Sequence, residues 1–145
     1  MTTAQMNGLE YLTAIKNGEL PGSAMGQLIP MKLNVVRENY VEYEVYPDQR
    51  HFNLQCGIHG GFCATVLDSV TGAAVHTTVE AGVSFSTIDL NVKMLKAMKN
   101  GETYTAIGEV IRTGRTVLTS EGRIVDKDSK IYAFGSATLL VTGRK

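Results

Sequence analysis

The sequence predicts the α+β fold class, with a single antiparallel sheet curled around one long central helix. The residues from Gly60 to about Val79 have helical periodicity and are apolar on most sides, which is typical of a helix inside a protein. Segments before and after that helix alternate apolar and polar residues, as half-buried strands do. The 145 residues, 43% of them hydrophobic, have the length and composition of one globular domain spanning 1-145.

The N-terminal part of the chain predicts a short amphipathic helix from Gln5 to Asn17, with Gly18 as its stop signal. Its apolar positions recur at helical spacing: Met6, Leu9, Leu12 and Ile15. The following stretch, from Leu20 to Pro30, contains two prolines and two glycines, so we expect an extended connection there.

Two paired strands are predicted next, from Lys32 to Arg37 and from Tyr40 to Tyr46, joined by a turn at Glu38-Asn39. In the second strand one set of side chains shares a face: Val41, Tyr43 and Val45. The central helix then carries a broad apolar stripe: Phe62, Cys63, Val66, Leu67, Val70, Ala73, Ala74 and Thr77.

Four further strands are predicted after the central helix and are expected to form an antiparallel meander. They run from Ser86 to Leu95, Thr103 to Arg112, Thr116 to Asp126 and Ile131 to Val141. The first has the clearest alternation, with one set of side chains expected to share a face: Ile88, Leu90, Val92 and Met94. Thr87 is then expected on the opposite face.

Composition excludes several classes of protein. Fourteen basic and fourteen acidic residues give a net charge of zero, which argues against binding to nucleic acid or to an anionic membrane. No apolar run is long enough to span a membrane, and the polar N-terminal residues predict no signal peptide, so we expect a cytoplasmic protein. Cys56 and Cys63 are expected to be reduced, buried thiols. The low charged content, 19%, hints that a partner subunit covers part of the surface.

Three glycines, Gly57, Gly60 and Gly61, gather where a loop enters the central helix. Backbone N–H groups at a helix N-terminus are unpaired and carry the positive end of the helix dipole. Left bare by glycines, they suit a carbonyl oxygen that gains negative charge, so the pattern indicates an oxyanion hole. The alternative is that the glycines only permit a tight turn and close packing.

Asp68 is the ionisable residue in the middle of this apolar helix, where a buried carboxylate is costly unless it is paired or faces a ligand. We interpret it as a general base or nucleophile with a raised pKa. The alternative is a buried Asp68 satisfied by the hydroxyls of Thr65 or Thr71.

The spacing of Gly60 and Asp68 along the helix predicts that two copies of the chain form the site. Gly60 and Asp68 are eight residues apart, so about 12 Å of helix axis separates them, and one carbonyl cannot touch both. The carboxylate is therefore expected to come from a second copy of the chain. In a two-fold dimer with antiparallel helices each helix N-terminus lies opposite the partner's carboxylate, which makes two equal sites.

Two loop residues beside the glycines are further candidates. His59 can bond a carbonyl or shape the loop, and Asn53 can orient water or a thioester. The alternatives are an ordinary loop histidine and the asparagine of an Asx turn. No metal site is expected, because the histidines and cysteines are not spaced as ligand pairs.

The run His59-Gly60-Gly61, with Asp68 seven residues after the second glycine and Asn53 before it, resembles the signature of hotdog-fold acyl-CoA thioesterases of the phenylacetic-acid-degradation (PaaI) type. The similarity extends from Pro21 to Val141, over roughly 120 residues. One departure is Cys56-Gly57-Ile58, which replaces a more polar approach to the turn and leaves the acyl preference open.

The resemblance implies a homodimer, or a tetramer of two dimers, that hydrolyses an aryl or medium-chain acyl-CoA with no cofactor beyond the coenzyme A of the substrate. The roles it implies are an oxyanion amide at Gly60, a nucleophile or base at Asp68, water or thioester orientation by Asn53 and assistance at the carbonyl by His59. Gly61 and Thr87 would line the substrate site, with Thr87 positioning water.

Four cations on or between the later strands are candidates for the phosphates of coenzyme A: Lys93, Lys96, Arg112 and Arg115. The alternative is that they are solvated surface charges. Two other functions are also open from the sequence: a hotdog hydratase or dehydratase, and a non-catalytic acyl-CoA-binding module.

Overall fold

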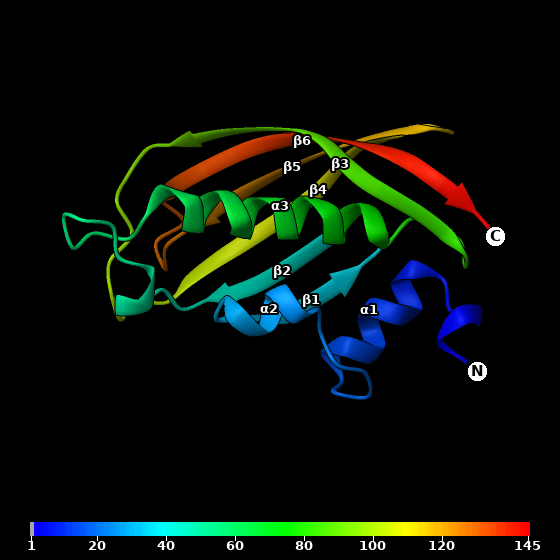
Figure 1. Cartoon of the computed structure of the whole chain (residues 1–145), viewed down its shortest axis with the longest axis horizontal. Coiled ribbons are helices and arrows are strands. Elements are labelled where there is room, and N and C mark those ends of the chain that lie inside the picture. Colours follow the sequence, from blue (N-terminus) through cyan, green and yellow to red (C-terminus); the bar gives the residue numbers. More distant parts are fainter. Residues whose placement is uncertain (1) are drawn as a thin grey trace.

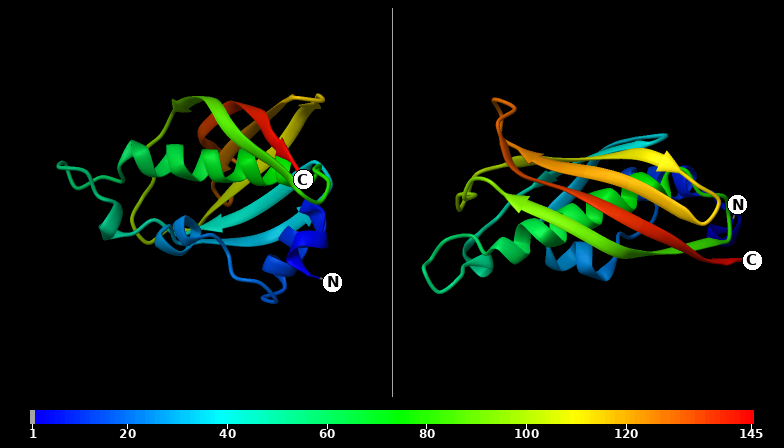
Figure 2. Two further views of the ribbon diagram at one scale, coloured as in Figure 1. Left: turned by 45° about the vertical axis from the view of Figure 1, so that its right-hand side comes forward. Right: turned by 90° about the horizontal axis from the view of Figure 1, so that it is seen from above.

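The computed structural model describes residues 2–145. Six antiparallel strands form one sheet in the order β1-β2-β4-β5-β6-β3, which curls around the helix α3 (Gly60–His76), as Figure 1 shows. Figure 2 shows the helices α1 (Gly8–Lys16) and α2 (Ala24–Leu28) on the same side of the sheet as α3. The predicted α+β class and the hotdog arrangement of sheet and central helix are confirmed.

The central helix α3 lies against the inner face of the sheet, mainly against β4 (Tyr104–Thr113) and β5 (Val117–Val125). It ends at His76, slightly before the predicted end. Six of its side chains are fully buried: Val66, Leu67, Val70, Thr71, Ala74 and Val75. Gly108 of β4 lets the two backbones approach, because a Cβ there would collide with the carbonyl oxygen of Val70.

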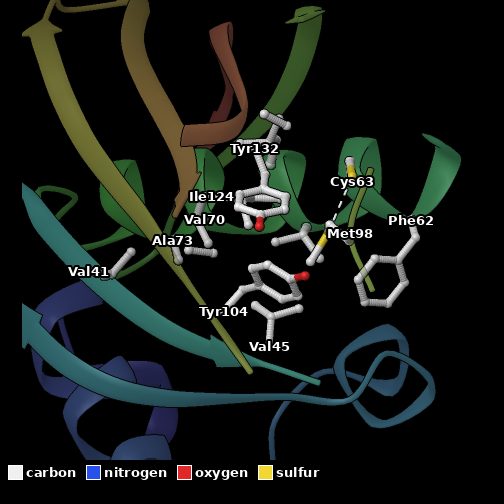
Figure 3. Packing of buried hydrophobic residues seen from close by; sticks show 14 of the residues in the cluster. Val41, Val45, Phe62, Cys63, Val70, Ala73, Met98, Tyr104, Ile124 and Tyr132 are labelled. Carbon is white, nitrogen blue, oxygen red and sulfur yellow. Dashed lines mark hydrogen bonds between the residues drawn. The ribbon is translucent and has the colours of Figure 1, made fainter. Parts of the chain in front are cut away.

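The core is densely packed at the end of the molecule where α3 begins, as Figure 3 shows. The rings of Tyr104 and Tyr132 meet edge to face with their centroids 4.9 Å apart. Beside them the Cys63 thiol lies 3.5 Å from the sulfur of Met98, and burial raises the pKa of that thiol. Both cysteines are free, but Cys56 is exposed, so the prediction that both are buried is wrong for Cys56.

The strand β3 (Val83–Met94) does not keep the predicted alternation along its whole length. The register with β6 (Ile131–Arg144) shifts between Thr87 and Asp89, which makes a bulge at Ile88. A bulge adds one residue to a strand and so resets which side chains face the core. As a result Ile88 is 58% exposed, and Thr87 lies on the inner face with Leu90, contrary to the prediction for both residues.

The order of the strands also corrects the predicted meander. β4, β5 and β6 are consecutive neighbours, but β3 lies beyond β6 at the edge of the sheet. The neighbour of β4 on the side away from β5 is β2 (Tyr40–Val45), not β3. On its other side β2 pairs with β1 (Met31–Arg37). A meander needs only short local turns, whereas this order requires the chain to cross from one edge of the sheet to its middle after β3.

The N-terminal segment differs from the prediction in two places. α1 starts only at Gly8, because Asn7 caps it by accepting the N–H of Glu10, and a separate 3₁₀ turn spans Thr3–Gln5. The stretch predicted to be extended contains α2, whose first turn is capped by the Ser23 hydroxyl accepting the N–H of Gly26 at 2.9 Å.

Candidate active site

The loop between β2 and α3 is held in place before it reaches the helix. A 3₁₀ turn at Gln49–His51 is capped by Asp48, whose carboxylate also binds the Arg50 guanidinium, and this pairing holds the pKa of that carboxyl below its usual value. The ring of His51 packs against Phe62 at 4.5 Å between centroids, with Nδ1 accepting the N–H of Asp48. The carbonyl of His51 in turn accepts the N–H of His59 at 2.8 Å, which fixes the entry to α3.

Asn53 organises the middle of this loop. Its side-chain oxygen accepts the N–H groups of Gln55 and Gly57 at 2.9 and 3.1 Å, which is the Asx turn considered as the structural alternative. Because the oxygen is engaged in this way, the amide nitrogen Nδ2 is left as a donor with no partner in the described chain. The turn and a role in binding are therefore compatible.

His59 is the N-cap residue of α3. Its Nδ1 accepts the N–H of Gly61 at 2.7 Å, and its carbonyl oxygen accepts the N–H of Phe62 at 2.9 Å. A ring nitrogen that accepts a hydrogen bond carries no proton, so the neutral ring has its proton on Nε2. His59 is exposed, and this Nε2–H is free to donate to a ligand.

The N–H of Gly60 is the open donor at the start of α3. The two amides that follow it are used by His59, whereas the Gly60 N–H has no hydrogen-bond partner among residues 2–145. An added Cβ at Gly60 would lie 2.5 Å from the sulfur of Met94, and one at Gly61 would lie 2.8 Å from Nδ1 of His59. Glycine thus permits close packing against Met94 at position 60 and keeps the cap intact at position 61.

Asp68 is exposed, on the one stripe of α3 that the sheet does not cover. The hydroxyls of Thr65 and Thr71 do not bond its carboxylate, since both donate to backbone carbonyls of the helix. The alternative of a buried, satisfied Asp68 is therefore wrong. The neighbours on the stripe are small, Ala64 and Gly72 among them, so another surface can approach closely.

The structure brings only some of the predicted residues together. Asn53, His59, Gly60 and Gly61 lie around the N-terminus of α3, while Asp68 is two turns further along the helix. Thr87 lies on the inner face of β3, paired with Leu139 of β6.

Arg115 lies far from the N-terminus of α3 in the same chain. It precedes β5 in the turn after β4, where Val117 pairs with Leu140, whereas Met94, which touches Gly60, pairs with Ala133 near the other end of β6. The remaining candidate cations, Lys93, Lys96 and Arg112, are exposed.

A cavity that reaches α3 at Ser69, the residue after Asp68, was not predicted from the sequence. Its lining comes from five elements, and the only sequence signal near it was Pro-Gly-Ser at 21–23, interpreted as part of an extended connection. Among the described residues no helix is long and apolar enough to cross a membrane.

The chain resembles known proteins in sequence. The sequence model of the thioesterase superfamily matches residues 57–133. Acyl-coenzyme A thioesterase 13 of Mus musculus is 27% identical over 96 residues, which are 66% of this chain and 68% of that protein. A Caenorhabditis elegans protein named for an inferred esterase activity is 31% identical over 97 residues, and the chain spans only 57% of its length.

Solved structures resemble the whole arrangement. A phenylacetic acid degradation-related protein of Ralstonia eutropha is 27% identical with a TM-score of 0.82, covering 90% of this chain and 99% of the other. A thioesterase-like protein of Streptococcus pneumoniae with bound coenzyme A is 23% identical with a TM-score of 0.72, covering 79% and 88%. At that identity the second likeness shows the fold alone.

Proposed function

Because this chain belongs to the thioesterase superfamily, a family of thioester hydrolases, we propose that it hydrolyses an aryl or medium-chain acyl-CoA to the free acid and coenzyme A. The observation that carries the proposal is the presence of a free Gly60 N–H at the start of α3 and an exposed Asp68 on the same helix, most of whose side chains pack into the core. The acyl-CoA thioesterase among its relatives supports the choice of substrate.

The proposed oxyanion hole lies at the N-terminus of α3. The Gly60 N–H donates to the thioester carbonyl, whose oxygen gains negative charge during attack and is favoured there by the helix dipole. The free Nε2–H of His59 and Nδ2–H of Asn53 supply further donors at the same end of the helix. Both side chains are held by hydrogen bonds to the loop, so little reorganisation is needed when charge develops.

The carboxylate is proposed to come from a second copy of the chain. Within one protomer about 12 Å of helix separates Gly60 from Asp68, too far for both to touch one carbonyl. A two-fold dimer with antiparallel α3 helices places Asp68 of each protomer at the partner's Gly60, and two such dimers could form a tetramer. The small side chains beside Asp68 on the open stripe leave room for this approach.

The chemistry is a single acyl transfer to water. As a general base, Asp68 takes a proton from water while the water oxygen bonds to the thioester carbon, and collapse of the tetrahedral species releases the thiol of coenzyme A, which takes up that proton. As a nucleophile, the carboxylate would form an anhydride that water then cleaves. A thioester has a good leaving group, so an amide and one carboxylate suffice without a cofactor other than coenzyme A.

Three further residues are given roles in binding the substrate or water. Thr87 on the inner face of β3 would position the attacking water, and Gly61 would line the site beside the oxyanion amide. Arg115 would meet the coenzyme A phosphates. Since it lies far from its own Gly60 along the sheet, it would serve the site formed by the partner's helix N-terminus.

The test is an acyl-CoA panel assayed by release of the free thiol. We expect Asp68→Asn to lower kcat by at least about 100-fold, as loss of a general base does. Its melting temperature should stay near that of wild type, because the side chain is exposed. Asp89→Asn is the matched control, an exposed carboxylate on the outer face of β3. Wild-type turnover by Asp68→Asn, or hydration of an enoyl-CoA without thiol release, would contradict the proposal.

A further inference from the structure

A cavity of about 510 Å³ lies between α3 and the N-terminal part of the chain. It is lined by residues from α1, α2, β1, β2 and α3 and by the connection before α2, and it is partly open to solvent. Its volume is in the range of pockets that hold small organic groups. Neither the loop before α3 nor the Gly60 amide lines it, so it is separate from the oxyanion site of the same protomer.

The cavity reaches the helix next to the proposed catalytic carboxylate. Three residues of α3 line it, and the first, Ser69, directly follows Asp68, with Ala73 and His76 on the next turns. A substrate whose carbonyl carbon lies at Asp68 can therefore extend its acyl group into this cavity. Coenzyme A would leave in the opposite direction, toward solvent and the partner chain.

The walls of the cavity are mostly apolar, with a few polar side chains among them. Leu12, Ile15, Met31 and Leu33 provide the apolar surface. Tyr43 of β2 lines the same cavity, and burial raises the pKa of its phenol to about 12, so it stays protonated and able to donate.

Three residues that line this cavity carry hydroxyls with no partner within the described part of the chain: Tyr11, whose ring stacks on His76, Tyr43 and Ser69. The missing hydrogen bond of the Ser69 hydroxyl contrasts with the hydroxyls near it on α3. Thr65 and Thr71 on the same helix bond to carbonyls one turn back, whereas the Ser69 hydroxyl makes no such bond. A polar group in an apolar cavity is costly to desolvate unless a ligand or water satisfies it.

We propose that this cavity receives the acyl group of the substrate and that Tyr43 and Ser69 select acyl groups bearing a hydrogen-bonding substituent. The inference rests on the proposed acyl-CoA hydrolysis. An unsubstituted acyl group that displaced water from the cavity would leave the two hydroxyls unpaired, whereas a hydroxyl or carbonyl on the acyl group would satisfy them. Tyr43 and Ser69 thus determine specificity and are not part of the bond-breaking machinery.

The first experiment compares hexanoyl-CoA with ω-hydroxyhexanoyl-CoA. For wild type we expect kcat/KM to favour the hydroxylated substrate by roughly 3- to 10-fold, the effect of one neutral hydrogen bond. Tyr43→Phe should reduce this preference, because hexanoyl-CoA then leaves no Tyr43 hydroxyl unpaired and the hydroxylated substrate loses one hydrogen bond. Tyr46→Phe is the matched control, because it removes a phenol that bonds Glu44 and does not line the cavity.

The second experiment fills the cavity. Gly22 lines it, and a Cβ there would meet no atom within 4 Å, so Gly22→Leu adds bulk without a backbone clash. We expect kcat/KM to fall about tenfold or more for hexanoyl-CoA and to stay unchanged for acetyl-CoA, whose acyl group does not reach the cavity. Gly143→Leu, in β6 and away from the cavity, is the control.

The outcomes separate this inference from the proposed function. If wild type hydrolyses acyl-CoAs but Gly22→Leu treats all chain lengths as wild type does, the cavity does not hold the acyl group. If Gly22→Leu behaves as expected but wild type shows no preference for ω-hydroxyhexanoyl-CoA, or Tyr43→Phe keeps the full wild-type preference, the selection by hydroxyls is wrong. Absence of hydrolysis for every acyl-CoA would instead refute the proposed function.

Discussion

At the scale of single residues, His59 combines a structural role with a proposed catalytic one. Its Nδ1 caps the helix by accepting the Gly61 N–H, and this bond fixes the proton on Nε2, where a substrate carbonyl could use it. Asn53 is arranged similarly, with its oxygen bound to the loop and its nitrogen free. In both residues the bond that holds the loop also determines which atom faces the ligand.

Replacement of His59 by two different residues separates these roles. His59→Ala should lower the free energy of unfolding by about 1 kcal/mol, because the helix loses its N-cap. His59→Ser keeps a capping oxygen and should unfold like wild type, yet both variants should lose roughly 10- to 100-fold in kcat if Nε2–H donates to the carbonyl. Urea unfolding and acyl-CoA assays measure the two effects, and full activity in the serine variant would show that the ring only caps the helix.

At the scale of elements, the packing of α1 against the end of α3 depends on His76. Its ring stacks on Tyr11 at 5.6 Å and meets Phe85 edge-on at 5.5 Å, so it bridges α1, α3 and β3. The Gly8 N–H donates to the carbonyl of Val79 at 2.9 Å, which brings the start of α1 against the same region. Burial lowers the pKa of His76, because the charged form is poorly solvated there.

This lowered pKa predicts how stability depends on pH. Above the unfolded pKa of about 6.5 the ring is neutral in both states and its contribution is fully present. Below that pH the unfolded chain binds a proton that the folded chain resists, so stability is lost as the pH falls. We expect the melting temperature to fall less between about pH 7.5 and 5.5 in His76→Phe, which keeps the ring contacts, than in wild type. Parallel curves for the two proteins would contradict this assignment.

At the scale of the whole molecule, the proposed site is incomplete in one protomer. The exposed Asp68 and the free Gly60 amide are at different positions along one helix, and only a second helix can bring a carboxylate to the amide. A dimer is therefore a requirement of the proposed mechanism. It would also place the open stripe of α3 against protein, which agrees with the low content of charged residues.

Complementation between two inactive variants tests the shared site. Gly60→Pro removes the amide hydrogen, and proline is well accepted at the first helical position, particularly since His59 has the extended backbone (φ −61, ψ 136) that precedes proline. Unfolding and refolding it together with Asp68→Ala should restore about one quarter of the sites, because half of the dimers are hybrids with one intact site each. No recovery, despite hybrids detected by native mass spectrometry, would indicate a site within one subunit.

The sequence alone determined the types and local order of the elements. The apolar periodicity of α3, the alternation in β2 and the placement of Gly60 and Asp68 on one helix all follow from local spacing, which is why these features were predicted. Tertiary structure decided which strands pair: β3 lies beside β6 at the edge of the sheet, and the bulge in their pairing turns Ile88 outward and Thr87 inward. It also decided that Asp68 is exposed and that Tyr43 and Ser69 share a cavity. Pairing and burial depend on contacts between distant segments, and spacing along the chain does not encode them.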